Sequence, residues 1–150
     1  MRALLLSLVV VVAVAPASSV VLGQAADPLV GVWKQNMANS RGSTVQSRIL
    51  TVELVDGGLR EINDAVLADG RSSHTEIVRK LDGKEYAVPN AQRPNTTDTS
   101  RRIDAYAYEW VEKVDGKVTM TTLVVVSRDG KTRTSTSTGR ENAVRVYEKP

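Results

Sequence analysis

The chain has 150 residues, a formal net charge of +3 and no cysteine, so its core has to hold without disulfides. The basic residues are scattered, and only Arg79-Lys80 and Arg101-Arg102 are adjacent pairs. Tracking a phosphate backbone needs a concentrated basic patch. We therefore expect no nucleic-acid partner.

The first 25 residues have the layout of a secretory signal peptide. Arg2 precedes a long apolar run, and small residues lead to a cut after Ala25. An uncleaved membrane anchor is the alternative, because about 20 apolar residues span a bilayer, but Pro16 interrupts the run. The absence of Cys excludes a lipoprotein. We expect a signal peptide at 1–25, a single domain at 26–150 without a membrane span, and a secreted or periplasmic location.

From residue 30 onward the chain is predicted to form β-strands, because apolar and polar residues alternate with a period of two. For example, Leu50 and Val52 share one face and Thr51 and Glu53 share the other. No segment shows a helical period, and residues 37–47 are too polar and short for more than a turn of helix. The nine predicted strands are 30–36, 48–55, 59–67, 73–81, 84–88, 101–114, 117–127, 131–138 and 142–149.

Five Asp-Gly pairs lie between predicted strands. Such a pair readily adopts the positive φ angles of a two-residue hairpin turn. Calcium-binding loops would need several alternating carboxylates and a terminal Glu, which none of the five has. We predict a turn at each of Asp56-Gly57, Asp69-Gly70, Asp82-Gly83, Asp115-Gly116 and Asp129-Gly130. Residues 89–100, with two prolines, are predicted as a long loop.

Successive hairpins make an antiparallel meander, and closing the meander into a barrel removes its exposed edges. We therefore predict an all-β fold, an up-and-down meander closed into a barrel of about 8–10 strands. A flat or sandwiched sheet is the alternative architecture.

Both ends of the chain resemble known barrel families. The segment "GVWKQN" (31–36) is similar to the Gly-x-Trp that opens the first strand of lipocalins and fatty-acid-binding proteins, and "VRVYEKP" (144–150) resembles the ending of the latter. Over essentially its whole length the chain resembles small secreted bacterial proteins described as lipocalin-like. The resemblance implies a calycin-type barrel that holds a small hydrophobic ligand.

The resemblance also implies roles for the last strand. In fatty-acid-binding proteins the C-terminal Arg and Tyr point inward and bind the ligand carboxylate, which here implies Arg145 and Tyr147. The second Arg of that site corresponds to Val125, and residues 37–47 cannot build that family's helical lid. In calycins an Arg or Lys near the chain end also packs over the Trp of Gly-x-Trp. A structural clasp of Gly31, Trp33 and Arg145 is thus the alternative to a ligand-binding Arg145.

Two aromatic residues are further candidates for a ligand site. Tyr108 and Trp110 share the bulky face of the strand 101–114 and would line the cavity, with plain barrel wall as the alternative. An eight-stranded barrel has room for its own side chains or for one small ligand. The absence of Phe favours a partly open lumen.

The sequence contains few residues that could form a catalytic site. His74 is the single histidine and there is no Cys, so the usual nucleophile and base pairs reduce to Ser or Thr with His74. His74 and Glu76 share a strand face, but a metal site needs three or more converging ligands. We predict no catalytic residue, no metal site and no cofactor.

The sequence therefore favours a secreted or periplasmic, non-enzymatic barrel that binds a small hydrophobic or amphipathic ligand in its lumen. The alternative is a filled barrel that acts through its surface as a protein-interaction or inhibitor module. The surfaces that would serve it are the 89–100 loop and the Thr/Ser-rich strand 131–138. The sequence names no protein partner.

Overall fold

The computed structural model describes residues 27–150, and the predicted signal peptide lies outside the described residues. It is built from ten antiparallel strands, which confirms the predicted all-β class. The strands are β1 (Gly31–Arg41), β2 (Val45–Val55), β3 (Gly58–Leu67), β4 (Ser72–Arg79), β5 (Asp82–Ala87), β6 (Thr96–Asp104), β7 (Ala107–Val114), β8 (Lys117–Val126), β9 (Thr132–Gly139) and β10 (Ala143–Glu148).

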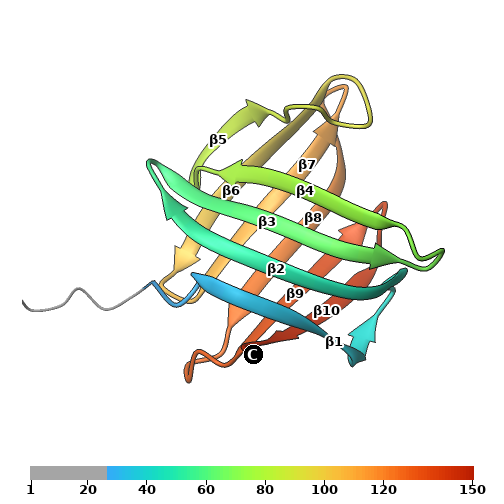
Figure 1. Cartoon of the computed structure of the whole chain (residues 1–150). Coiled ribbons are helices and arrows are strands. Elements are labelled where there is room, and N and C mark those ends of the chain that lie inside the picture. Colours follow the sequence, from blue (N-terminus) through green and yellow to red (C-terminus); the bar gives the residue numbers. More distant parts are fainter. Residues whose placement is uncertain (1–26) are drawn as a thin grey trace, which may run out of the picture.

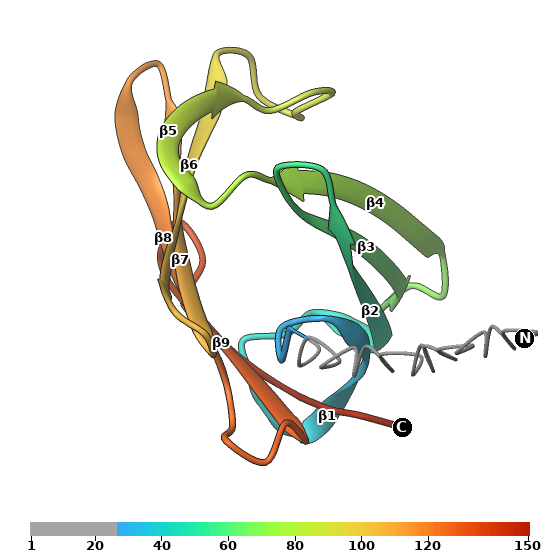
Figure 2. The ribbon, with the colours of Figure 1, turned by 90° about the vertical axis from the view of Figure 1, so that its left-hand side faces the viewer.

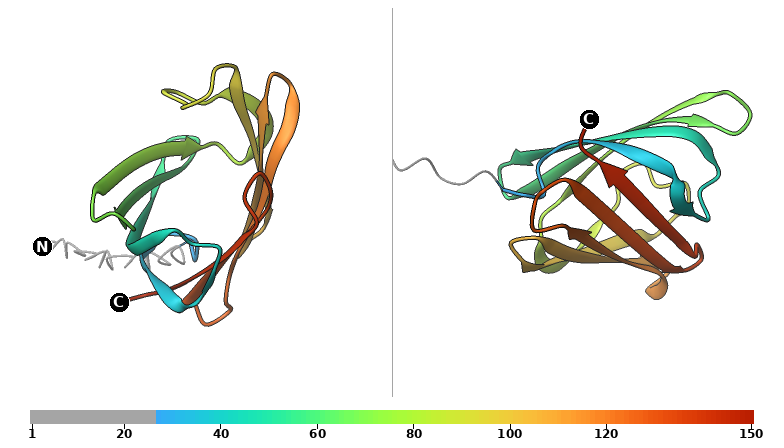
Figure 3. Two further views of the ribbon diagram at one scale, coloured as in Figure 1. Left: turned by 90° about the vertical axis from the view of Figure 1, so that its right-hand side faces the viewer. Right: turned by 90° about the horizontal axis from the view of Figure 1, so that it is seen from below.

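The ten strands form one sheet in the order β4-β3-β2-β1-β10-β9-β8-β7-β6-β5. The chain meanders from each strand to the next, and the antiparallel pairing of β1 with β10 joins its two ends. The sheet curls into a barrel (Figure 1). Strands β1–β4 and β5–β10 thereby face each other across the interior (Figure 3). The prediction of an up-and-down barrel of about 8–10 strands is confirmed.

Strands β4 and β5 are consecutive in the chain but lie at opposite ends of the sheet order, with no backbone ladder between them. They diverge in space after the connection at Lys80 and Leu81 (Figure 2). Leu81 has a φ of 57°. The predicted hairpin turn at Asp82-Gly83 is therefore wrong, because both residues belong to β5, at an irregularity in its pairing with β6. The other four Asp-Gly pairs lie in hairpin connections, as predicted.

The predicted strand 101–114 is two strands, β6 and β7, separated by a turn at Ala105 and Tyr106. The turn is supported by Asp104, whose Oδ1 accepts a hydrogen bond from the Tyr106 backbone N at 2.6 Å. Strand β6 already begins at Thr96, so the predicted loop 89–100 is shorter than expected. The inward residues of β6 are polar, so this strand lacks the alternation of apolar and polar residues that predicts a strand. These inward residues are Thr96, Asp98 and Ser100, all buried.

The connection between β1 and β2 is three residues long, Gly42 to Thr44. Of residues 37–47, which lie outside the predicted strands, β1 includes 37–41 and β2 includes 45–47. Gly42 has a φ of 69°, and a Cβ at this position would lie 2.5 Å from the Asn142 backbone O. No helical lid is therefore present between these strands.

The apolar core fills one end of the barrel, which we call the base. The base holds the connections β2–β3, β4–β5, β6–β7 and β8–β9, and we call the opposite end the rim. The buried cluster at the base consists of Leu29, Trp33, Leu50, Val52, Leu59, Tyr108, Val124, Val126 and Tyr147. Within residues 27–150 no helix is long and apolar enough to cross a membrane.

Candidate functional site

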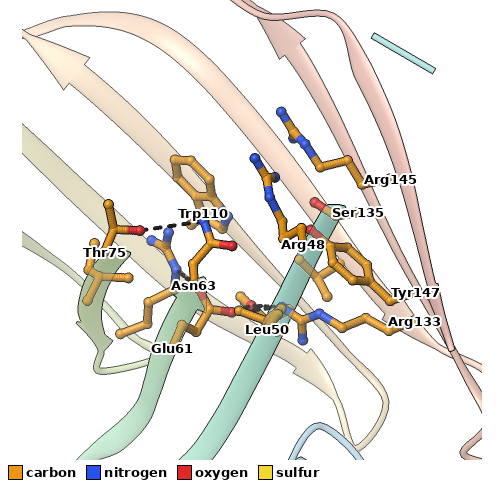
Figure 4. A pocket seen from close by; sticks show the side chains of 14 residues that line it. Arg48, Leu50, Glu61, Asn63, Thr75, Trp110, Arg133, Ser135, Arg145 and Tyr147 are labelled. Carbon is orange, nitrogen blue, oxygen red and sulfur yellow. Dashed lines mark hydrogen bonds and ion pairs between the residues drawn. The ribbon is translucent and has the colours of Figure 1, made fainter. Parts of the chain in front are cut away.

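Between the apolar core and the rim, inward side chains enclose a cavity of about 180 Å³ (Figure 4). Its wall combines four arginines and one glutamate with neutral polar, aromatic and aliphatic groups. The lining residues are Arg48, Leu50, Glu61, Asn63, Thr75, Ile77, Arg79, Tyr108, Trp110, Val124, Arg133, Ser135, Arg145 and Tyr147. The lumen is thus partly open, and five of its 14 lining residues are charged.

Glu61 on β3 is the centre of a buried polar network. Its carboxylate accepts hydrogen bonds from Arg79 Nε and Arg133 Nη2, both at 2.7 Å, and from the Tyr108 hydroxyl. Burial by itself would raise the pKa of Glu61, but the charges of Arg79 and Arg133 outweigh burial and lower this pKa to about 2. Burial also raises the pKa of the Tyr108 hydroxyl. At neutral pH Glu61 is therefore ionised and Tyr108 is a hydrogen-bond donor.

Arg79 on β4 connects the two ends of the sheet. Its Nη1 forms an ion pair with Asp98 on β6, and its guanidinium carbon lies 4.1 Å from the centroid of the Trp110 ring on β7. Burial raises the pKa of Asp98 more than Arg79 lowers it. Because β4 and β5 share no backbone ladder, side-chain contacts of Arg79 link the sheet edges in its place.

Strand β10 directs Arg145 and Tyr147 into the barrel, where both line the cavity. Tyr147 is buried opposite Arg133 on β9. Arg145 forms an ion pair with Glu141 in the connection between β9 and β10. Ligand binding by Arg145 and Tyr147 stays a prediction, and their position in the cavity wall is compatible with it.

The cation over Trp33 is Lys149 and not Arg145, which corrects the predicted clasp. Lys149 Nζ lies 4.8 Å from the centroid of the Trp33 ring. A Cβ at Gly31 would lie 3.2 Å from Lys149 Cε, so Gly31 leaves room for the lysine stem. Lys149 follows the strand at the base, where Trp33 packs, whereas Arg145 lies nearer the rim.

Tyr108 and Trp110 both face the lumen, as the alternation predicted. Tyr108 is completely buried, and its hydroxyl donates to Glu61 and accepts from Arg133 at 2.7 Å. Trp110 is half-buried and packs against Arg79. Both residues therefore hold the polar network together in addition to lining the cavity.

His74 lies outside the cavity, on the exposed face of β4. Its Nδ1 is 2.6 Å from Asp64 Oδ1, and both side chains are more than half exposed. Glu76 pairs with Arg60 on the same outer face. Among residues 27–150, no three His, Asp or Glu side chains converge as they would around a metal ion.

Most of the charged residues of the site were not predicted from the sequence. In the Thr/Ser-rich segment 131–138 the threonines face outward, and the opposite face carries Arg133. That Arg interrupts an otherwise small and neutral face, which is the signal that would have found it. The missed residues are Arg48, Glu61, Arg79, Asp98 and Arg133.

No protein-family model matches the chain, and no curated protein matches its sequence. Its fold is similar to that of the fluorescent protein UnaG, with a TM-score of 0.57 and 18% identity over 81% of this chain and 97% of that one. It is also similar to a Schistosoma mansoni fatty acid binding protein in complex with arachidonic acid, with a TM-score of 0.57 and 16% identity over 82% and 96% of the two chains. A fatty acid transporter gives a TM-score of 0.56 at 11% identity, over 81% and 96%. These likenesses show a calycin-like barrel fold.

Proposed function

We propose that this protein is a secreted or periplasmic, non-enzymatic barrel that holds a small amphipathic molecule in its cavity. The main support for this proposal is a cavity of about 180 Å³ whose wall combines apolar surface with unpaired polar atoms. Two of the structurally similar proteins are named for fatty acids, which supports a binding role and not a catalytic one.

The volume of the cavity limits the size of the ligand. Sites for drug-sized molecules measure roughly 300–1,000 Å³, whereas this cavity measures about 180 Å³. The apolar part of the ligand would lie against Leu50, Ile77 and Trp110. We therefore favour a short amphipathic molecule over a long-chain fatty acid, with Arg145 and Tyr147 among the polar groups available to it.

The first test closes the cavity without changing the outer surface. Ser135 lines the cavity, and its neighbour Thr134 on β9 faces the opposite side of the sheet. With delipidated protein titrated with octanoate by calorimetry, we expect Ser135→Phe to weaken binding at least about 10-fold, a loss of about 1.4 kcal/mol. Thr134→Phe should leave the affinity within about threefold of wild type, because a change of under 1 kcal/mol is expected from a surface site.

An equal loss in the two variants would place binding on the outer surface and contradict the proposal. Both variants are checked by urea unfolding, so that a loss of binding is scored only for folded protein. If wild-type protein binds neither octanoate nor octan-1-ol, the cavity has no carrier role, and the surface-acting barrel becomes the better account.

The proposed location has its own test. When the full chain is expressed in a bacterial host, we expect the protein to be recovered from the periplasm or the medium with Ala26 as its first residue, because residues 1–25 have the signal-peptide layout. Intact mass and N-terminal sequencing measure this directly. Recovery of the uncleaved chain in the cytoplasm would contradict the location and leave the binding proposal unaffected.

A further inference from the structure

The four arginines of the cavity differ in whether a carboxylate accompanies them. Three have ion-pair partners; Arg79 pairs with Glu61 and Asp98, Arg133 with Glu61, and Arg145 with Glu141. Arg48 forms no ion pair with any residue in 27–150, and residues 1–26 contain no Asp or Glu. Four guanidinium groups thus face three carboxylates, which leaves one positive charge unmatched.

Arg48 is built into the cavity wall and is not a surface residue that happens to lie nearby. It lies on β2 opposite the buried Ala65 of β3 and on the same strand face as Leu50. Its Nε is buried and has no hydrogen-bond partner. In Figure 4 the side chains of Arg48 and Arg145 extend away from Glu61 and Arg133, toward the other end of the cavity.

The guanidinium of Arg145 is less available to a ligand than that of Arg48, although both side chains reach the same part of the cavity. The Arg145 guanidinium is held by Glu141, so an incoming anion would compete with a carboxylate already in place. A cation without a partner in a partly buried site is costly, and a bound anion removes that cost. A guanidinium also offers two parallel N–H donors that match a carboxylate.

We propose that Arg48 binds the anionic group of a small monoanion. The ligand's charged end lies toward the rim, and its apolar end packs between Leu50, Ile77 and Trp110. This inference rests on the proposed function, and it names both the charge of the ligand and the residue that binds it. One carboxylate on the ligand would match the one unpaired guanidinium of the lumen.

The test compares ligands of one chain length and different charge. Delipidated protein is titrated with octanoate, octan-1-ol, octylamine and the dianion octanedioate. We expect octanoate to bind about 10- to 100-fold more tightly than octan-1-ol, as charge-assisted hydrogen bonds allow. Arg48→Gln should remove this preference and leave the affinity for octan-1-ol within about threefold, while Arg48→Lys should keep part of it. Arg60→Gln is the matched control, because Arg60 lies outside the cavity and pairs with Glu53 and Glu76, and it should retain the preference for octanoate.

Thermal unfolding of the ligand-free protein provides a second readout. Because Arg48→Gln removes an unpaired cation, we expect the Tm of the free protein to rise while octanoate binding falls. A purely structural role of Arg48 would lower the Tm, and that result would overturn the inference.

Other results separate the inference from the proposed function. Equal affinity for octanoate and octan-1-ol, or an equal loss in Arg48→Gln and Arg60→Gln, would overturn the role of Arg48 while the carrier function stands. Tighter binding of octanedioate than of octanoate would overturn the inference that the ligand carries a single negative charge. Failure of all four probes to bind wild-type protein would overturn both.

Discussion

Replacing Glu61 with Gln should lower the free energy of unfolding by about 3–5 kcal/mol, as expected when one partner is removed from a buried ion pair. Glu61 is the only carboxylate that Arg133 contacts among the described residues, and it also holds Arg79 and Tyr108. The amide of Gln would leave Arg133 as an uncompensated buried charge. Urea unfolding at neutral pH measures the effect.

The same substitution should lose its effect in acid. The pKa of Glu61 is lowered from 4.5 to about 2 in the folded protein, so its stabilising contribution is complete well above pH 4.5 and is lost as the pH falls toward 2. This shift corresponds to about 3 kcal/mol. The difference between wild type and Glu61→Gln should therefore shrink through this window and vanish near pH 2. Asp98 adds nothing to this loss, because its pKa is raised and its protonation favours the folded state.

The control for Glu61 is Glu53→Gln, which breaks an exposed pair with Arg60 and should cost less than about 1 kcal/mol. If Glu61→Gln does not fold, Glu61→Gln combined with Arg133→Met should recover structure, since it removes the unpaired charge as well. A pH-independent difference between wild type and Glu61→Gln would show that Glu61 acts through packing and not through its charge.

Replacing Trp33 with Ala should cost about 3–5 kcal/mol, the usual range for a large aromatic residue in a packed core. Trp33 is completely buried in the base cluster. Its loss would leave a void beneath the cavity that the surrounding strands cannot close without breaking their ladders. Urea unfolding of the variant, followed by far-ultraviolet circular dichroism, measures the cost.

Lys149→Met separates the contribution of the Lys149 charge from that of the buried Trp33 ring. It keeps the stem over the ring and removes the charge 4.8 Å from its centroid, so we expect a loss of about 0.5–1 kcal/mol, typical of an exposed cation and aromatic pair. Arg145→Gln should leave Trp33 unaffected. A cost for Lys149→Met as large as that for Trp33→Ala would mean that the cation, and not burial of the indole, stabilises the base.

Local alternation correctly predicted which residues share a strand face. Tyr108 and Trp110 face the lumen together, and so do Arg145 and Tyr147, because side chains two residues apart on a strand point to the same face. The resemblance, and not alternation, implied that Arg145 and Tyr147 point inward. Four of the five Asp-Gly pairs lie in hairpin connections for a similar reason, since backbone geometry at these turns depends on two adjacent residues. These features are set by neighbours in the chain.

The alternation of apolar and polar residues did not reveal strands whose inward side chains are polar. Strand β6 points Thr96, Asp98 and Ser100 inward, so its pattern resembled a loop. Alternation also could not choose between Arg145 and Lys149 for the clasp, because both share one face of the last strand. Four residues of extended chain, about 13 Å, separate them, and only the depth of Trp33 in the barrel decides between them.

The sequence by itself determined most of the strands, four of the five Asp-Gly turns and which neighbouring side chains share a strand face, because each of these depends on a few consecutive residues. Only the tertiary structure decided which charges meet. Glu61 lies 18 residues from Arg79 and 72 from Arg133, and closure of the barrel brings the three together. The same closure brings Asp98 to Arg79 and Glu61 to Arg133, whereas Arg145 pairs with the nearby Glu141 and Arg48 has no carboxylate partner among residues 27–150.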